Sequence, residues 1–279
     1  MSATRTHPMG APGITIGVFD SGFGGLTVLR ELLPLVPGAH YVYLGDTARL
    51  PYGAKSQATI ARYAVESARF LEAHGAEHLV IACNTASALA MREIVSSVSI
   101  PVTGVIAPVV QMTHYRHQRA ETLILATTAT VQSHAYRVFC EARDLRPTEK
   151  ACPLLVPLIE EGWIDHPITR DVLRIYLREA LDICSPTVVI LGCTHYPLIA
   201  PLVSETLKEL GSSAEVVDSA KATAFVVSTG YRKSVELSNA VSNATFECFV
   251  TDSVEKFERL GSNFLGQAVE GVQLVDLGG

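Results

Sequence analysis

The sequence predicts an α/β protein with two similar half-domains, each a mostly parallel sheet flanked by helices, and with the active site in the cleft between them. Short runs rich in valine and isoleucine alternate with longer amphipathic segments, a pattern typical of parallel sheets covered on both faces. The 279 residues, 48% of them hydrophobic, suffice for a substantial core. Two distant segments, 78–87 (HLVIACNTAS) and 187–197 (TVVILGCTHYP), share the order of strand, cysteine, threonine-bearing turn and helix.

The amino-terminal elements follow from the hydrophobic pattern. A GFGG turn after the first strand leads into a helix over Leu26–Leu33. Apolar residues recur at helical spacing in Ile60–His74, and the alanine-rich stretch Ala86–Val95 also favours a helix. The strands predicted in this part are short apolar runs: Ile14–Phe19, Tyr41–Leu44, Leu79–Ala82 and Val102–Ile106.

Later apolar runs predict strands at Leu123–Ala126, Val188–Leu191 and Glu215–Val217. The carboxy-terminal segment is expected to return to the first domain. The predicted division is a flexible leader (1–13), a first domain carrying Cys83 (14–105 plus 216–279) and a second domain carrying Cys193 (106–215).

Composition argues against several classes of protein. The net charge is −6 and the 22 basic residues are scattered, whereas a nucleic-acid groove usually shows a basic stripe. The longest apolar stretches, such as Leu79–Cys83, are far shorter than a bilayer span. The first residues lack the apolar centre of a secretory signal. We therefore expect no nucleic-acid site, no membrane segment and a cytoplasmic location.

Two of the six cysteines differ from the rest. The set contains no CxxC pair and no zinc-ligand spacing, so most are expected to be reduced, buried and inert, and no metal is expected. Cys83 and Cys193, however, each end an apolar strand and precede a predicted helix N-terminus. Such a terminus binds carboxylates and favours thiolate over thiol. Because ligands of open α/β sheets bind outside the carboxyl ends of the strands, both thiols can face one crevice.

Other polar residues near strand ends leave alternatives open. His195 can polarise the thiol of Cys193 or lie at the solvent edge. The DSGFGG turn matches no phosphate-binding pattern, so Asp20 could receive a substrate ammonium or orient Cys83. Glu160 by itself reads as a solvated surface acid.

Two further loops are equally ambiguous. The loop LGDTARLPYG ends in a rigid turn at Pro51–Gly53 with exposed N–H groups, or is merely a connection. Thr127, Thr128 and Thr130 suit a carboxylate or a helix cap equally well.

Taken together, GVFDSGFGG, YLGDTARLPYG, IACNTAS, GVIAP, CPLLVPLIEEG and ILGCTHYPLI resemble the glutamate racemase family, within the wider aspartate/glutamate racemases. These motifs run in order from Ile14 to Pro201. Two places depart from the family pattern, Ala107 in GVIAP and the glycine-free ATTATVQSHAY segment. The departures concern the contacts expected of Thr127 and Thr130, not the cysteine loops.

The resemblance implies a racemase that encloses glutamate between two catalytic cysteines, without pyridoxal phosphate, another cofactor or a metal. Cys83 and Cys193 would be the acid/base pair. Asp20 would assist Cys83, while His195 and Glu160 would assist Cys193. The implied substrate-binding residues are Asp20, Ser21, Pro51, Tyr52, Gly53, Asn84, Thr85, Thr127, Thr130, Thr194 and His195. It further implies supply of D-glutamate for peptidoglycan, and homodimers are common in the family.

Three other functions remain compatible with the sequence. One is a racemase of aspartate or of another small acidic amino acid. The second is a cysteine hydrolase built on Cys193 and His195, which leaves Cys83 without a task. The third is a non-catalytic small-ligand-binding protein on the same fold.

Overall fold

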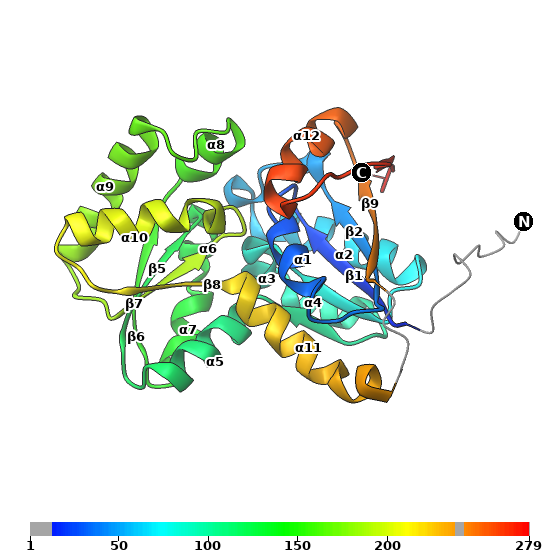
Figure 1. Ribbon diagram of the computed structural model, residues 1–279, viewed down its shortest axis with the longest axis horizontal. Helices are drawn as coiled ribbons and strands as arrows, with labels where there is room; N and C mark the ends of the chain where they lie inside the picture. Colours follow the sequence, from blue (N-terminus) through cyan, green and yellow to red (C-terminus); the bar gives the residue numbers. More distant parts are fainter. Residues whose placement is uncertain (1–12, 238–242, 279) are drawn as a thin grey trace, which may run out of the picture.

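Two parallel sheets flanked by helices make up the computed structural model, which describes residues 13–237 and 243–278 (Figure 1). Every strand pair in these ranges is parallel. The predicted fold class is therefore confirmed. The expected leader falls, apart from Gly13, outside the described residues.

The first sheet has six strands in the order β10-β9-β2-β1-β3-β4. We call this sheet and its helices the first half. Its strands are β1 (Thr15–Asp20), β2 (His40–Gly45), β3 (His78–Ile81), β4 (Val102–Gly104), β9 (Thr245–Val250) and β10 (Gln273–Leu274). Its helices are α1 (Leu26–Leu32), α2 (Gln57–Ala73), α3 (Asn84–Leu89), α4 (Met91–Ser97) and α12 (Val254–Leu265), with short 3₁₀ turns η1 (Thr47–Arg49) and η2 (Tyr52–Ala54).

The second sheet has four strands in the order β6-β5-β7-β8, and with its helices it forms the second half. Its strands are β5 (Glu121–Ala126), β6 (Arg146–Ala151), β7 (Val188–Gly192) and β8 (Glu215–Asp218). Its helices are α5 (Ile106–Arg116), α6 (Thr128–Ser133), α7 (Ala135–Glu141), α8 (Leu155–Glu160), α9 (Pro167–Leu181) and α10 (Ala200–Glu209), with the 3₁₀ turn η3 (Tyr196–Ile199).

Burial on both faces explains why the central strands are almost continuously apolar. All six residues of β1 are buried. Ile16 and Val18 pack into one hydrophobic cluster with α1 and α12, while Phe19 packs into another with α2 on the opposite face. This alternation follows from the two-residue period of a strand. It leaves the strand ends as the place for polar residues, and β1 ends at Asp20.

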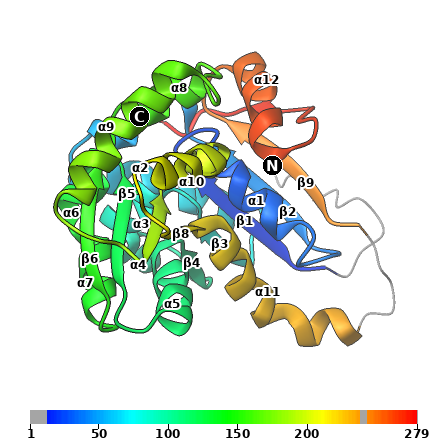
Figure 2. The same cartoon turned by 60° about the vertical axis from the view of Figure 1, so that its left-hand side comes forward.

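The chain returns to the first half through α11 (Ser219–Leu237), which packs against both α1 and α5 (Figure 1). Residues 216–218, grouped with the first domain in the sequence analysis, belong to β8 and pair with β7 of the second sheet. We therefore propose the domain limits as 14–105 and 219–279 for the first, with 106–218 for the second. Figures 1 and 2 both show α12 beside α8, so the carboxy-terminal segment also borders the second half.

Several predicted element limits were wrong. The strand expected at Val102–Ile106 stops at Gly104, because α5 begins at Ile106. The helix expected over Ala86–Val95 is two helices, since Ala90 leaves helical geometry with φ −132°. None of the described helices is long and apolar enough to cross a membrane.

Candidate active site

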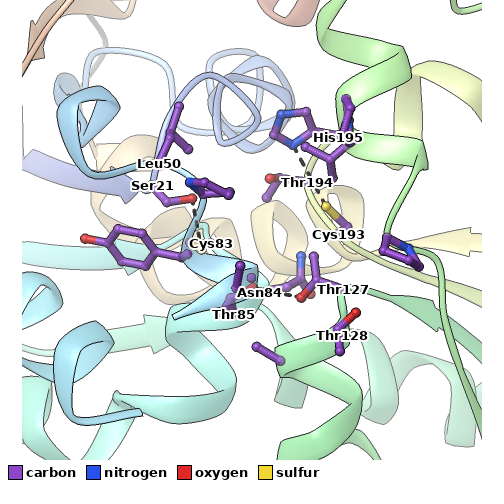
Figure 3. A pocket seen from close by; sticks show the side chains of 18 of the residues that line it. Ser21, Leu50, Cys83, Asn84, Thr85, Thr127, Thr128, Cys193, Thr194 and His195 are labelled. Atoms are coloured by element: carbon purple, nitrogen blue, oxygen red, sulfur yellow. Dashed lines mark hydrogen bonds between the residues drawn. The ribbon is translucent and has the colours of Figure 1, made fainter. Parts of the chain in front are cut away.

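A cavity of about 570 Å³ lies between the two halves, at the carboxyl ends of their strands (Figure 3). Its volume is in the range of small-molecule sites. The predicted residues that line it come from both halves: Ser21, Pro51, Tyr52, Gly53, Cys83, Asn84, Thr85, Thr127, Glu160, Cys193, Thr194 and His195. Asp20 and Thr130 are not among the lining residues. They lie buried directly behind the wall.

Cys83 follows β3 and caps α3, as its place at a strand end predicts. Its Sγ accepts a hydrogen bond from the Ala86 backbone N–H at 3.4 Å. The thiol donates to the Ser21 hydroxyl at 3.5 Å. Burial, followed by the nearby Asp20 carboxylate, raises the pKa of Cys83 to about 12. The structure therefore favours the protonated thiol at this position.

Cys193 follows β7 and has a different partner. Its Sγ lies 3.9 Å from Nδ1 of His195, whose Nε2 lies 3.1 Å from Oε1 of Glu160. Burial alone would lower the pKa of His195, but its hydrogen bonds to Cys193 and Glu160 raise that pKa to about 10. A protonated imidazole beside the sulfur stabilises a thiolate.

The surroundings of His195 and Glu160 resolve two alternatives that the sequence left open. His195 is only 5% exposed, so it does not lie at the solvent edge. Glu160 is not a solvated surface acid, because its side chain is 18% exposed and pairs with His195. Burial acts to raise the pKa of Glu160, but the hydrogen bond with His195, the charge of His195 and the charge of Lys256 together outweigh burial and lower that pKa.

Asp20 connects the two cysteine loops from behind the wall. Its Oδ2 accepts from the Gly22 N–H at 2.9 Å, and its Oδ1 accepts from the Thr194 hydroxyl at 3.5 Å. Burial raises the pKa of Asp20, although the charge of His195 opposes that shift. The carboxylate is thus near Cys83 but does not reach the cavity surface.

A polar wall suited to a carboxylate lies between the thiols. The Tyr136 hydroxyl donates to Asn84 Oδ1 at 2.6 Å. The buried Nδ2 of the same side chain has no hydrogen-bond partner among the described residues. The hydroxyls of Thr85, Thr127 and Thr130 form a triangle with edges of 3.1, 3.3 and 2.9 Å. An unsatisfied buried amide beside these hydroxyls offers donors to an anionic oxygen.

The loop after β2 closes the cavity on another side. Tyr52 is buried, and its hydroxyl donates to the carboxylate of Asp46, which also accepts from Thr251 at 2.9 Å. A Cβ added at Gly53 would lie 3.1 Å from Cβ of Thr127, so this glycine permits close approach of the two halves.

Figure 3 shows Cys83 and Cys193 on opposite sides of the cavity, one from each half. Among residues 13–237 and 243–278, no group of three or more histidine, cysteine, aspartate or glutamate side chains is arranged to hold a metal ion. A small molecule in this cavity would have one thiol on each side of it. That arrangement suits proton removal on one face and proton delivery on the other.

Comparison with known proteins agrees with this geometry. The family model for Asp/Glu/Hydantoin racemase matches residues 16–227. The chain belongs to this racemase family. It is 48% identical to the glutamate racemase of Koribacter versatilis, covering 95% of this chain and 98% of that protein. It is 41% identical to the glutamate racemase of Persephonella marina, and the match covers 92% of this chain and 95% of that protein.

Solved structures place this racemase with the glutamate racemases. A crystal structure of the Francisella tularensis enzyme in complex with D-glutamate matches with a TM-score of 0.85 and 32% identity over 95% of this chain and 98% of that one. The Thermus thermophilus glutamate racemase matches with a TM-score of 0.83 and 38% identity, over 96% of this chain and 99% of that one. An aspartate racemase from Picrophilus torridus is 17% identical with a TM-score of 0.57, which shows the fold alone.

The racemase cavity also contains residues that the sequence analysis did not assign to the site. They include Lys55, Gln132, Cys152 and Glu161. Lys55 continues the PYG turn by two residues, so the motif itself was a usable signal. Cys152 precedes Pro153 in the CPLLVPLIEEG motif, whose cysteine was treated as an inert core thiol.

Proposed function

We propose that this chain interconverts L- and D-glutamate by a two-base mechanism in which Cys83 and Cys193 are the acid/base pair. The observation that carries the proposal is that both thiols line one cavity, from opposite sides (Figure 3). Membership of the racemase family and the relatives named glutamate racemase support the reaction type and the substrate.

In the mechanism that we propose, a Cys193 thiolate removes the α-proton from one face of the amino acid. The Cys83 thiol then delivers its own proton to the opposite face of the same carbon. The product has inverted configuration, and the enzyme is left with a Cys193 thiol and a Cys83 thiolate. Reaction of the opposite enantiomer, or proton exchange with water, restores the starting state. The high pKa of Cys83 suits this cycle, because its thiolate is then a strong base for the return reaction.

The polar wall would stabilise the intermediate. Removal of the α-proton places extra negative charge on the substrate carboxylate. The unpartnered Nδ2 of Asn84 is a donor already held at the wall, and the hydroxyls of Thr85 and Thr127 can rotate to donate beside it. Preorganised donors of this kind commonly account for a large share of the rate enhancement. Asp20 would adjust the proton affinity of Cys83 rather than contact substrate, because it lies behind the wall.

The competing functions explain fewer of these contacts. A hydrolase built on Cys193 and His195 leaves Cys83, on the opposite side, without a role. A binding protein needs neither thiol. An aspartate racemase would use the same chemistry, and only the length of the substrate distinguishes it.

The product and the setting follow from the same proposal. D-Glutamate is a component of peptidoglycan, so the reaction would supply cell-wall precursors. Both thiols must stay reduced, and all six cysteines are free, which suits a reducing cytoplasm. A homodimer remains our expectation from the family, and the oligomeric state in solution tests it.

Isotope exchange tests the proposed function. Incubation with L-glutamate in deuterated water should place deuterium at the α-carbon and form D-glutamate. L-Aspartate in a parallel reaction should exchange far more slowly. Absence of both exchange and inversion, with glutamate only raising thermal stability, would indicate a binding protein instead. If L-aspartate exchanged its α-proton faster than L-glutamate, aspartate and not glutamate would be the substrate.

A further inference from the structure

Lys55 is the only lysine or arginine among the described residues that line the cavity. It ends the η2 turn, where its backbone N–H donates to the Tyr52 carbonyl at 3.0 Å. The turn packs against α6 of the other half. Tyr52 is buried while Pro51 and Ala54 are exposed, so the loop runs from the interior to the rim of the cavity. Lys55 is half-buried at that rim.

The side chain of Lys55 has no structural partner that accounts for its charge. It makes no hydrogen bond or ion pair with any other described residue, in contrast to Lys150, which pairs with Glu179. A lysine at a half-buried position is favoured when an anion lies near its ammonium group, because the anion compensates for hydration lost on burial. An anionic ligand in the cavity can therefore serve as this partner.

The other charges of the cavity make a local cation necessary for an acidic ligand. Glu160 and Glu161 line the same cavity, and only Glu160 is paired with a base, His195. The whole chain carries a net charge of −6. A dicarboxylate amino acid approaching this cleft is repelled by these charges unless a nearby cation attracts it.

We infer that Lys55 is the cationic recognition residue of the cavity, attracting a carboxylate of the acidic substrate at the rim. This inference rests on the proposed function, because it assigns the anion to the dicarboxylate amino acid. Lys55 acts in capture and binding, whereas the proton transfers belong to the two thiols. Its loss should therefore raise KM and reduce kcat/KM while kcat changes little.

Racemisation kinetics of three variants test this inference. Lys55→Met removes the cation, Lys55→Arg keeps it, and Lys208→Met removes an exposed lysine of α10 that does not line the cavity. Lys55→Met should raise KM for glutamate by about five- to tenfold, because one nearby charge is removed. Lys55→Arg and Lys208→Met should stay within about twofold of the parent chain.

The salt dependence separates recognition from a structural defect. Raising NaCl from about 30 mM to about 300 mM should reduce kcat/KM of the parent chain, because salt screens attraction to Lys55. In Lys55→Met the same salt should leave kcat/KM unchanged or raise it, since the positive charge of His195 is paired with Glu160 and Glu161 still repels an acidic ligand. An unchanged KM in Lys55→Met, or the same downward salt response in both proteins, would overturn the inference.

Calorimetric binding of D-glutamate separates this inference from the proposed function. Weaker binding in Lys55→Met than in Lys208→Met supports the role of Lys55 even if no racemisation is detected. Equal binding in the two variants contradicts it. Failure of the parent chain to racemise glutamate would remove the proposed function independently.

Discussion

Nε2 of His195 lies 3.1 Å from Oε1 of Glu160, and both side chains are largely buried. This pairing turns Nδ1 toward Sγ of Cys193, at 3.9 Å. Cys83 has no such base and instead donates to the Ser21 hydroxyl. The two thiols on either side of the cavity therefore have different electrostatic surroundings, although they occupy equivalent positions at strand ends.

Replacement of Glu160 by glutamine should shift the alkaline limit of activity toward neutral pH. His195 has a pKa of about 10 in the folded chain, above its ordinary value. Its protonated form is complete below the ordinary pKa and is lost as pH rises through the raised one. Loss of the Glu160 charge lowers the pKa of His195, so Glu160→Gln should lose about tenfold in kcat/KM at pH ~9 relative to pH ~7.

Profiles of kcat/KM against pH check this expectation. Ionisation of the substrate ammonium affects both proteins equally, so the difference between them reports on His195. Glu161→Gln, a neighbour that makes no pair with His195 in the structure, is the matched control. Identical alkaline limbs in Glu160→Gln and the parent chain would contradict the proposed coupling.

Asp20→Asn should make Cys83 more reactive toward alkylation. The Asp20 carboxylate is the second cause, after burial, of the raised pKa of Cys83. Asparagine keeps an oxygen to accept from the Gly22 N–H but removes the negative charge. In a Cys193→Ser background at neutral pH, iodoacetamide should modify Cys83 about three- to tenfold faster. Mass spectrometry of the Cys83 peptide measures the rate.

The exposed Asp182 at the end of α9 supplies the control for this measurement. Asp182→Asn in the same background should leave the rate of Cys83 modification unchanged. A rate for Asp20→Asn equal to that of Asp182→Asn would show that Asp20 does not set the proton affinity of this thiol.

The sequence predicted those parts of the fold that a local pattern encodes. Strands β1, β3, β5 and β7 are buried on both faces, so their hydrophobic runs are continuous and easy to recognise. The edge strand β6 (RPTEKA) was missed, because it is partly exposed and pairs with β5 alone. Its polar residues resemble those of a loop.

The candidate site was likewise predictable only where a local sequence pattern marks the residue. Cys83 and Cys193 stand at strand ends, a position that the sequence itself reveals. The place of Glu160 came only from the family resemblance, because its burial depends on the approach of α8 to His195 in the folded chain. The choice between two roles for Asp20 likewise needed the tertiary structure, which places the carboxylate behind the wall.

Gly24→Ala should displace the second cysteine loop. A Cβ added at Gly24 would lie 2.2 Å from Oγ1 of Thr194 and 2.5 Å from Nδ1 of His195. Both residues are buried, and the added methyl group would force them to move by about 1 Å. We expect kcat/KM to fall by about 100-fold, since errors of this size in catalytic geometry are that costly. Gly230→Ala, whose added Cβ has nothing within 4 Å, should be neutral or stabilising. Activity of Gly24→Ala near the parent level would mean that the loop adjusts freely.

Serine at either Cys83 or Cys193 should abolish racemisation while the chain still folds and binds glutamate. A serine hydroxyl has nearly the same shape but almost never ionises near neutral pH. The face of the substrate beside the serine then lacks its acid/base group, so inversion cannot be completed. Cys184 is the matched control, because it is half-buried, lies outside the cavity and donates to the Ala180 carbonyl, a bond that serine can replace. Cys184→Ser should keep full activity. Circular dichroism, D-glutamate binding and chiral analysis of the product measure fold, affinity and reaction separately. Substantial racemisation by Cys83→Ser or by Cys193→Ser would show that one base suffices and would remove the two-thiol mechanism.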